Sequence, residues 1–102
     1  MAVMRLIAFT PKPGNEERVA NLLEALDTAL SLQQGYVLGL RFTGQAESSE
    51  LGRIFVWESH ELADAAEASP EASPLSRRIE TLSEEARLDR TFDLQGYALR
   101  PG

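Results

Sequence analysis

Residues 53–70 read "RIFVWESHELADAAEASP", and this stretch decides how the chain folds. Its first part, 53–58, is short, apolar and rich in β-branched and aromatic side chains, which predicts a strand. Ser59 is a good N-cap residue, and Ser69-Pro70 disfavours helix before the proline. The sequence therefore predicts a strand that is followed at once by a short helix.

The segments before and after this stretch carry equally clear signals. Residues 3–9 and 36–43 are apolar and end in turn residues, and 91–99 predicts a last strand. The segment 15–35 repeats apolar residues at helical spacing, and Asn15 is placed to cap its first amide groups. Three further strands and one long helix are therefore expected.

A second helix is expected after the proline break. Ser73 and Pro74 form a cap followed by proline at the first helical position. Apolar residues then mark one side of that helix: Leu75, Ile79, Leu82 and Ala86. The order is β-α-β-β-α-β, which predicts an α+β, ferredoxin-like domain over residues 1–102. Its four-stranded antiparallel sheet would carry both helices on one face.

Composition excludes several classes of function. The net charge is −6, from 16 acids and 10 bases, which argues against nucleic acid and anionic membrane surfaces as partners. Absence of cysteine excludes disulfides and thiolate chemistry. No apolar run is long enough for a signal peptide or a membrane span, so we expect a cytoplasmic protein. Most acids after residue 46, Glu67 among them, are expected on solvated helix faces.

Both sides of the predicted sheet are apolar. The strand at 3–9 carries large apolar groups on each side, and so does the strand at 53–58. In the strand at 36–43, one face is predicted to hold Tyr36, Leu38, Leu40 and Phe42. Two helices cover one face only, so we expect a homodimer in which a second copy covers the other. The end of the chain, "GYALRPG" (96–102), is a candidate for a strand exchanged with that copy.

The stretch "FVWESHELADAAEASP" (55–70), after a hairpin and before an amphipathic helix, resembles the antibiotic biosynthesis monooxygenase-like proteins. The beginning "LIAFTPKPGNEERVANLLEAL" (6–26) resembles their first strand and helix. The resemblance covers nearly the whole chain and implies a dimeric α/β barrel. It leaves the reaction open, because this superfamily includes monooxygenases, haem-degrading enzymes, isomerases, decarboxylating enzymes and proteins without a known reaction.

The sequence departs from that family at several positions. Ala66 and Glu71 stand where family members often carry histidines, and the only histidine is His60. The strand at 3–9 lacks the asparagine that haem-degrading relatives need, so haem degradation is not expected. Neither a metal site nor a cofactor is expected, because ligand clusters, glycine-rich phosphate loops and dinucleotide fingerprints are all missing.

We expect a ligand pocket between the sheet and the helices that takes a small apolar or aromatic metabolite. Its predicted lining is aromatic: Phe9, Tyr36, Phe42, Phe55 and Trp57. Weaker candidates for catalysis are Trp57, His60, Arg41, Arg53 and Tyr36. We favour a packing role for Trp57 and a solvent-exposed place for His60 at the first helical turn.

Arginines interrupt the otherwise apolar strands at Arg5, Arg41 and Arg53. A guanidinium on an inner sheet face must find an anion or a carbonyl group, and it can hold a carboxylate, an enolate or a phenolate. The simpler interpretation is a salt bridge across the dimer or a side chain that reaches the sheet edge.

Three functions stay open at this point. The first is a cofactor-independent monooxygenase that acts on a small aromatic or polyketide-like metabolite. The second is a non-catalytic dimer of the same fold that binds a ligand or assists a pathway, which the missing helix histidines favour. The third is an isomerase or cyclase. Whether the protein is an enzyme at all is not decided by its sequence.

Overall fold

The computed structural model describes residues 1–45, 49–85 and 87–102. Along the chain, the elements are β1 (Val3–Phe9), α1 (Glu16–Ser31), β2 (Tyr36–Thr43), β3 (Leu51–Trp57), α2 (His60–Glu67), α3 (Ser73–Thr81) and β4 (Leu88–Asp93). Every strand pair is antiparallel, and the strand order is β2-β3-β1-β4. The predicted ferredoxin-like α+β fold is confirmed, with α2 and α3 separated at the proline break.

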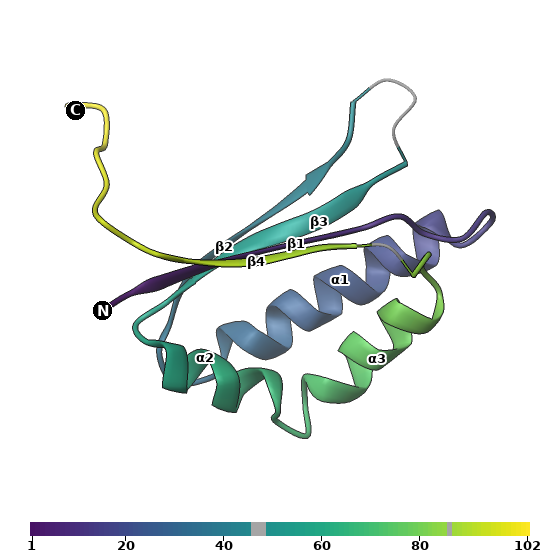
Figure 1. The fold of residues 1–102 in the computed structure, drawn as a ribbon, viewed down its shortest axis with the longest axis horizontal. Helices are drawn as coiled ribbons and strands as arrows, with labels where there is room; N and C mark the ends of the chain where they lie inside the picture. The colour runs from purple at the N-terminus through teal and green to yellow at the C-terminus, as the bar shows by residue number, and fades with distance from the viewer. Residues whose placement is uncertain (46–48, 86) are drawn as a thin grey trace.

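Helices α1, α2 and α3 lie on one side of the sheet, and none of the described helices or strands covers the other side (Figure 1). The buried side of α1 consists of Val19, Leu23, Leu26 and Leu30. These leucines and valine pack with the inward residues of β3, which include Phe55 and Trp57, to form the core. None of the helices within the described ranges is both long and apolar enough to cross a membrane.

The three predicted helix caps have different outcomes. The prediction for Ser73 is wrong, because Ser73 is the first residue of α3 and Ala72 holds the N-cap position, although Pro74 lies in the first turn as predicted. The Ser59 hydroxyl accepts a hydrogen bond from the Leu62 backbone N–H at 3.2 Å, as an N-cap does. Asn15 precedes α1, but the prediction that its side chain caps the helix is wrong. Its amide instead donates to the Pro13 carbonyl at 3.4 Å.

The last strand begins earlier than predicted and is shorter. It covers Leu88–Asp93 rather than 91–99, because its residues pair with β1 from Ala8 back to Val3. After Asp93, the Leu94 N–H still donates to the Ala2 carbonyl at 2.9 Å. Residues 94–102 have no regular structure and run away from the helices (Figure 1). Helix α3 ends at Thr81, and Ala86, which was expected on its apolar side, lies outside the described residues.

A β-bulge in β2 overturns the predicted face of Tyr36. Tyr36 pairs with Trp57 and Leu38 pairs with Val56, so one extra residue of β2 lies between them. Tyr36 therefore points to the helix side, while Leu38, Leu40 and Phe42 point to the other side. A bulge inserts one residue and so reverses the alternation that the sequence pattern assumed.

The uncovered side of the sheet, called the bare face below, is apolar. Register and alternation place on it Met4, Leu6, Ala8, Leu38, Leu40, Phe42, Ile54, Val56, Leu88 and Phe92. Arg90 is the charged member of this face among the described strand residues. Leu38, Leu40, Leu88 and Phe92 are exposed to solvent in a single chain. The predicted excess of apolar sheet over what the helices shelter is present in the structure.

Candidate functional site

A cavity of about 140 Å³ lies between the helix side of the sheet and the helices. All three helices and strands β1, β3 and β4 contribute to its wall. The side chains that matter for its chemistry are Phe9, Arg53, Glu67, Glu80, Arg87 and Asp89. We call it the Arg53 cavity.

Arg53 is the unusual member of this wall because its side chain is only 1% exposed. Its guanidinium stacks 3.9 Å above the Phe55 ring, and Nη2 donates to Asp27 Oδ1 at 2.7 Å. Nε and Nη1 are buried, and the described residues offer neither of them a hydrogen-bond partner. Buried N–H groups nearly always have partners, so these two nitrogens are suited to an oxygen atom of a ligand.

Burial lowers the pKa of Arg53 from its ordinary value, although the neighbouring Asp27 carboxylate works in the opposite direction. An arginine nevertheless remains charged at neutral pH, since its ordinary pKa lies above 12. Arg53 therefore places a fixed positive charge and unused N–H groups beside the cavity, and groups of this kind stabilise an oxyanion.

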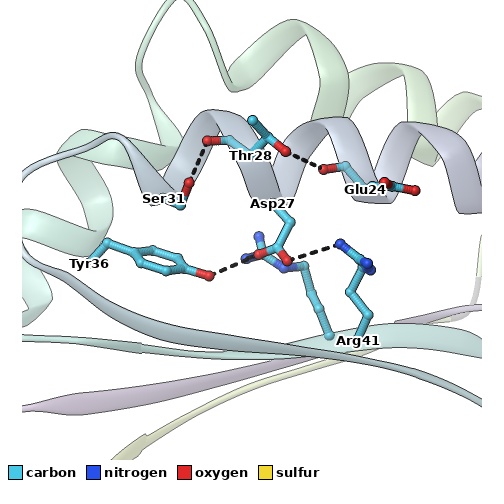
Figure 2. Close-up of polar contacts among 7 residues, drawn as sticks. Glu24, Asp27, Thr28, Ser31, Tyr36 and Arg41 are labelled. Carbon is cyan, nitrogen blue, oxygen red and sulfur yellow. Dashed lines mark hydrogen bonds and ion pairs between the residues drawn. The ribbon is translucent and has the colours of Figure 1, made fainter.

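Asp27 of α1 holds this part of the site together. Its carboxylate points from the helix to the sheet and lies between Tyr36 and Arg41 (Figure 2). The Tyr36 hydroxyl donates to Oδ1 at 2.9 Å, and Arg41 Nη1 donates to Oδ2 at 3.3 Å. With the bond from Arg53, three side chains of β2 and β3 converge on one carboxylate.

The tyrosine in this cluster is a donor. Burial raises the pKa of Tyr36, and the bond to Asp27 raises it further, so the hydroxyl keeps its proton at neutral pH. The hydroxyl lies directly over Gly39, where a Cβ atom would be 2.0 Å from the Tyr36 oxygen and 2.8 Å from Asp27 Oδ1. A glycine in the middle of β2 therefore leaves room for the cluster.

Sequence reasoning missed Asp27, although a signal was present. Asp27 follows Leu23 by four residues and precedes Leu30 by three, so it lies on the same side of α1 as the buried leucines. An acid on the apolar side of a helix needs a buried partner. The three strand arginines were the available partners, and two of them, Arg41 and Arg53, bind it.

Glu67, at the end of α2, was expected on a solvated face but borders the Arg53 cavity. Arg5 Nη1 donates to Glu67 Oε2, and Arg5 Nη2 donates to Asp64 Oδ1 at 2.7 Å. Burial raises the pKa of Glu67 by more than the Arg5 guanidinium lowers it. Glu67 thus has a pKa displaced towards neutrality in the wall of a cavity, which is a property of acid–base groups.

We predict that Glu67→Gln is more stable than the wild type at pH 7 and that this advantage disappears as the pH falls. The raised pKa means that the folded state prefers the protonated acid. Glu67 therefore contributes stability below its unfolded-state pKa, and the contribution is lost as the pH rises through its folded-state pKa. Urea unfolding of both proteins between pH 4 and pH 8 measures the difference. An advantage that grows towards pH 4 would contradict the assignment.

The other predicted site residues lie elsewhere. Trp57 is fully buried in the core, with its ring centroid 5.2 Å from that of Tyr36 in an edge-on contact. Its Nε1 has no hydrogen-bond partner within residues 1–45, 49–85 and 87–102. His60 is exposed at the start of α2, and its Nε2 atom lies 3.7 Å from Asp93 Oδ1. Phe42 and Arg41 border a separate open groove of about 190 Å³ beside α1. Of the five aromatic residues predicted to line one pocket, Phe9 alone borders the Arg53 cavity in the described part of the chain.

No protein-family model and no curated protein sequence matches the chain. Solved structures share its fold. SnoaB of Streptomyces nogalater, a cofactor-independent oxygenase, aligns with a TM-score of 0.82 and 19% identity over 94% of this chain and 95% of its own. Rv0793 of Mycobacterium tuberculosis aligns with a TM-score of 0.86 and 18% identity over 97% and 100%.

A putative antibiotic biosynthesis monooxygenase from Nitrosomonas europaea aligns with a TM-score of 0.83 and 7% identity over 92% of this chain and 90% of its own. The similarity extends along nearly the whole length in each case. At these identities, it shows a common fold.

Proposed function

We propose that this chain is a homodimeric member of the antibiotic biosynthesis monooxygenase-like family that oxidises a small aromatic metabolite with O₂ and needs no cofactor. The observation that carries the proposal is the Arg53 cavity, in which Nε and Nη1 of a buried arginine lack partners. The fold that the chain shares with SnoaB supports the same reaction class.

The proposed reaction uses the electrons of the substrate itself. An electron-rich phenol loses its hydroxyl proton, and the resulting anion transfers electrons to O₂. A ring C–H carbon then takes one oxygen atom, the other oxygen atom leaves as water, and the ring becomes a hydroxyquinone, so that hydroquinone (C₆H₆O₂) and O₂ give C₆H₄O₃ and H₂O. Arg53 would stabilise the phenolate, and the apolar wall residues Ile7, Phe9 and Leu26 would pack against the ring.

The bare face supports the homodimer. Monomers rarely expose an apolar patch larger than a few hundred Å². Covering such a patch contributes roughly 25 cal/mol per Å² before the costs of association are subtracted. A second copy packed sheet to sheet by two-fold symmetry covers it. Tyr97 and Leu99, exposed in the irregular segment 94–102, would then lie along the partner as an exchanged strand.

Oxygen uptake tests the proposed reaction. We expect the wild type to consume one O₂ per molecule of hydroquinone or anthrone-type phenol without an added cofactor, with a chelator present. Arg53→Gln should lower the rate by about a hundredfold or more, as removal of an oxyanion donor does. Arg77→Gln, at an exposed position on α3, removes the same group outside the cavity and should leave the rate unchanged.

The absence of uptake with every phenol tested would contradict oxidation. If the same phenols still bound, the protein would be the non-catalytic ligand-binding dimer instead. Thermal unfolding of Arg53→Gln shows whether a lost rate comes from the site or from a lost fold. Trp57→Phe keeps an aromatic core residue and reports whether the indole itself is needed.

A further inference from the structure

We infer that the Arg53 cavity selects an uncharged phenol with a single aromatic ring, and that Glu67 is the residue that makes it reject acids. The inference rests on the proposed function for the identity of the site. It adds the size and charge of the ligand and a specificity-determining residue.

The size of the cavity favours one ring. Its volume is about 140 Å³. An engineered protein cavity of about 150 Å³ binds benzene, whereas pockets for drug-sized molecules occupy about 300–1,000 Å³. A ring with one or two hydroxyl groups therefore fills this space, and fused polycyclic molecules exceed it.

The charges around the cavity favour a neutral ligand. Three carboxylates, from Glu67, Glu80 and Asp89, face two guanidinium groups, from Arg53 and Arg87, so the wall has one negative charge in excess. Behind the wall, Arg5 and Asp27 add one positive and one negative charge, which cancel, so the excess of the wall remains. A carboxylate on the ligand would add a second negative charge close to these carboxylates.

The surface beside the cavity also carries more negative than positive charges. An adjoining groove of about 260 Å³ shares Phe9, Glu80 and Arg87 with the Arg53 cavity and adds Glu84 and Glu85. Acids would therefore meet repulsion both outside and inside. A phenol, with an ordinary pKa near 10, enters uncharged at neutral pH.

The polar groups of the wall are complementary to a phenol. The unpartnered Nε and Nη1 of Arg53 can donate to a phenol oxygen. Arg5 donates to Glu67 Oε2, which leaves Oε1 to accept from a phenol hydroxyl. In the proton transfer that follows, the O–H bond of the phenol breaks and an O–H bond to Oε1 forms. The negative charge then moves to the oxygen beside Arg53, and no electron is transferred to another molecule.

Titration calorimetry without oxygen tests this selectivity independently of oxidation. The three probes are hydroquinone, 2,5-dihydroxybenzoate, which adds a carboxylate, and 1,4-dihydroxynaphthalene, which adds a ring. We expect hydroquinone to bind about tenfold more tightly, or better, than each of the others. Equal or tighter binding of the acid or of the two-ring compound would overturn the inference.

Glu67→Gln separates charge from size. It removes the excess negative charge, so the preference for hydroquinone over the acid should shrink to about threefold or less, while the preference over the naphthalene compound persists. The matched control is Glu58→Gln, which changes the net charge equally at an exposed residue and should preserve both preferences. An unchanged acid preference in Glu67→Gln would also overturn the inference.

The outcomes distinguish this inference from the proposed function. If the probes bind as expected but no oxygen is consumed, the proposed ligand class is supported and the proposed oxidation is contradicted. If oxygen is consumed and the acid or the two-ring compound is the better substrate, the proposed ligand class is contradicted and the proposed oxidation is supported. No binding of hydroquinone would overturn the ligand class directly.

Discussion

Asp27→Ala is expected to destabilise the fold by about 3–5 kcal/mol, because it leaves a buried guanidinium without its carboxylate. The Arg53 side chain is 1% exposed and that of Asp27 is 16% exposed, so water cannot replace the missing partner. The substitution also removes the acceptor of the Tyr36 hydroxyl. Urea unfolding at pH 7, monitored by the fluorescence of Trp57, the only tryptophan, measures the loss.

A matched control exists in the same protein. Asp64→Ala also removes a carboxylate from an arginine, here Arg5, but Asp64 is 71% exposed. Its expected cost is small, several-fold below that of Asp27→Ala, as for exposed ion pairs. Replacing Arg53 by methionine in the Asp27→Ala background should recover much of the loss, since the unpaired charge is then gone. Similar costs for Asp27→Ala and Asp64→Ala would contradict the role given to burial.

The second large effect concerns the bare face, where Leu40→Arg is expected to convert the proposed homodimer into monomers. Leu40 lies on edge strand β2 and is 57% exposed in a single chain, so the substitution leaves the core intact. In a two-fold dimer, it places one unpaired charge from each copy in the apolar contact. We expect the dissociation constant to rise about a hundredfold or more, measured by light scattering after size exclusion.

Leu32→Arg is the control for this experiment. Leu32 is 81% exposed, but it follows α1 on the helix side of the molecule, away from the bare face. The variant should keep the mass of the wild type. A wild type that is monomeric at micromolar concentration, or a Leu40→Arg variant that remains dimeric, would contradict the sheet-to-sheet dimer.

The fold could be predicted because its signals are local. Alternation in 53–58, helical spacing in α1 and two Ser-Pro pairs each determine an element from a few neighbouring residues. The excess of apolar sheet could also be predicted, since it follows from the residue types on both sides of β1 and β3. The bounds of β4 could not be predicted, because the residues of β1 that pair with it, rather than its own sequence, decide where it begins and ends.

The site was harder to predict because it depends on contacts distant in sequence. Asp27 and Arg53 are 26 residues apart, and Glu67 and Arg5 are 62 apart. Sequence patterns singled out both arginines as needing partners but could not choose among 16 acids. The bulge that turns Tyr36 towards Asp27 has no pattern of its own, because one inserted residue reverses an alternation that otherwise looks continuous.

The Nε–H resonance of Arg53 gives the most direct test of the Arg53 cavity as the ligand site. A buried Nε–H exchanges slowly enough to be followed in ¹H–¹⁵N spectra, and its absence in Arg53→Lys assigns it. During an anaerobic titration with hydroquinone, we predict that this resonance shifts and saturates together with the calorimetric binding curve. Hydroquinone that binds while the Arg53 resonance stays in place would contradict the assignment of the site.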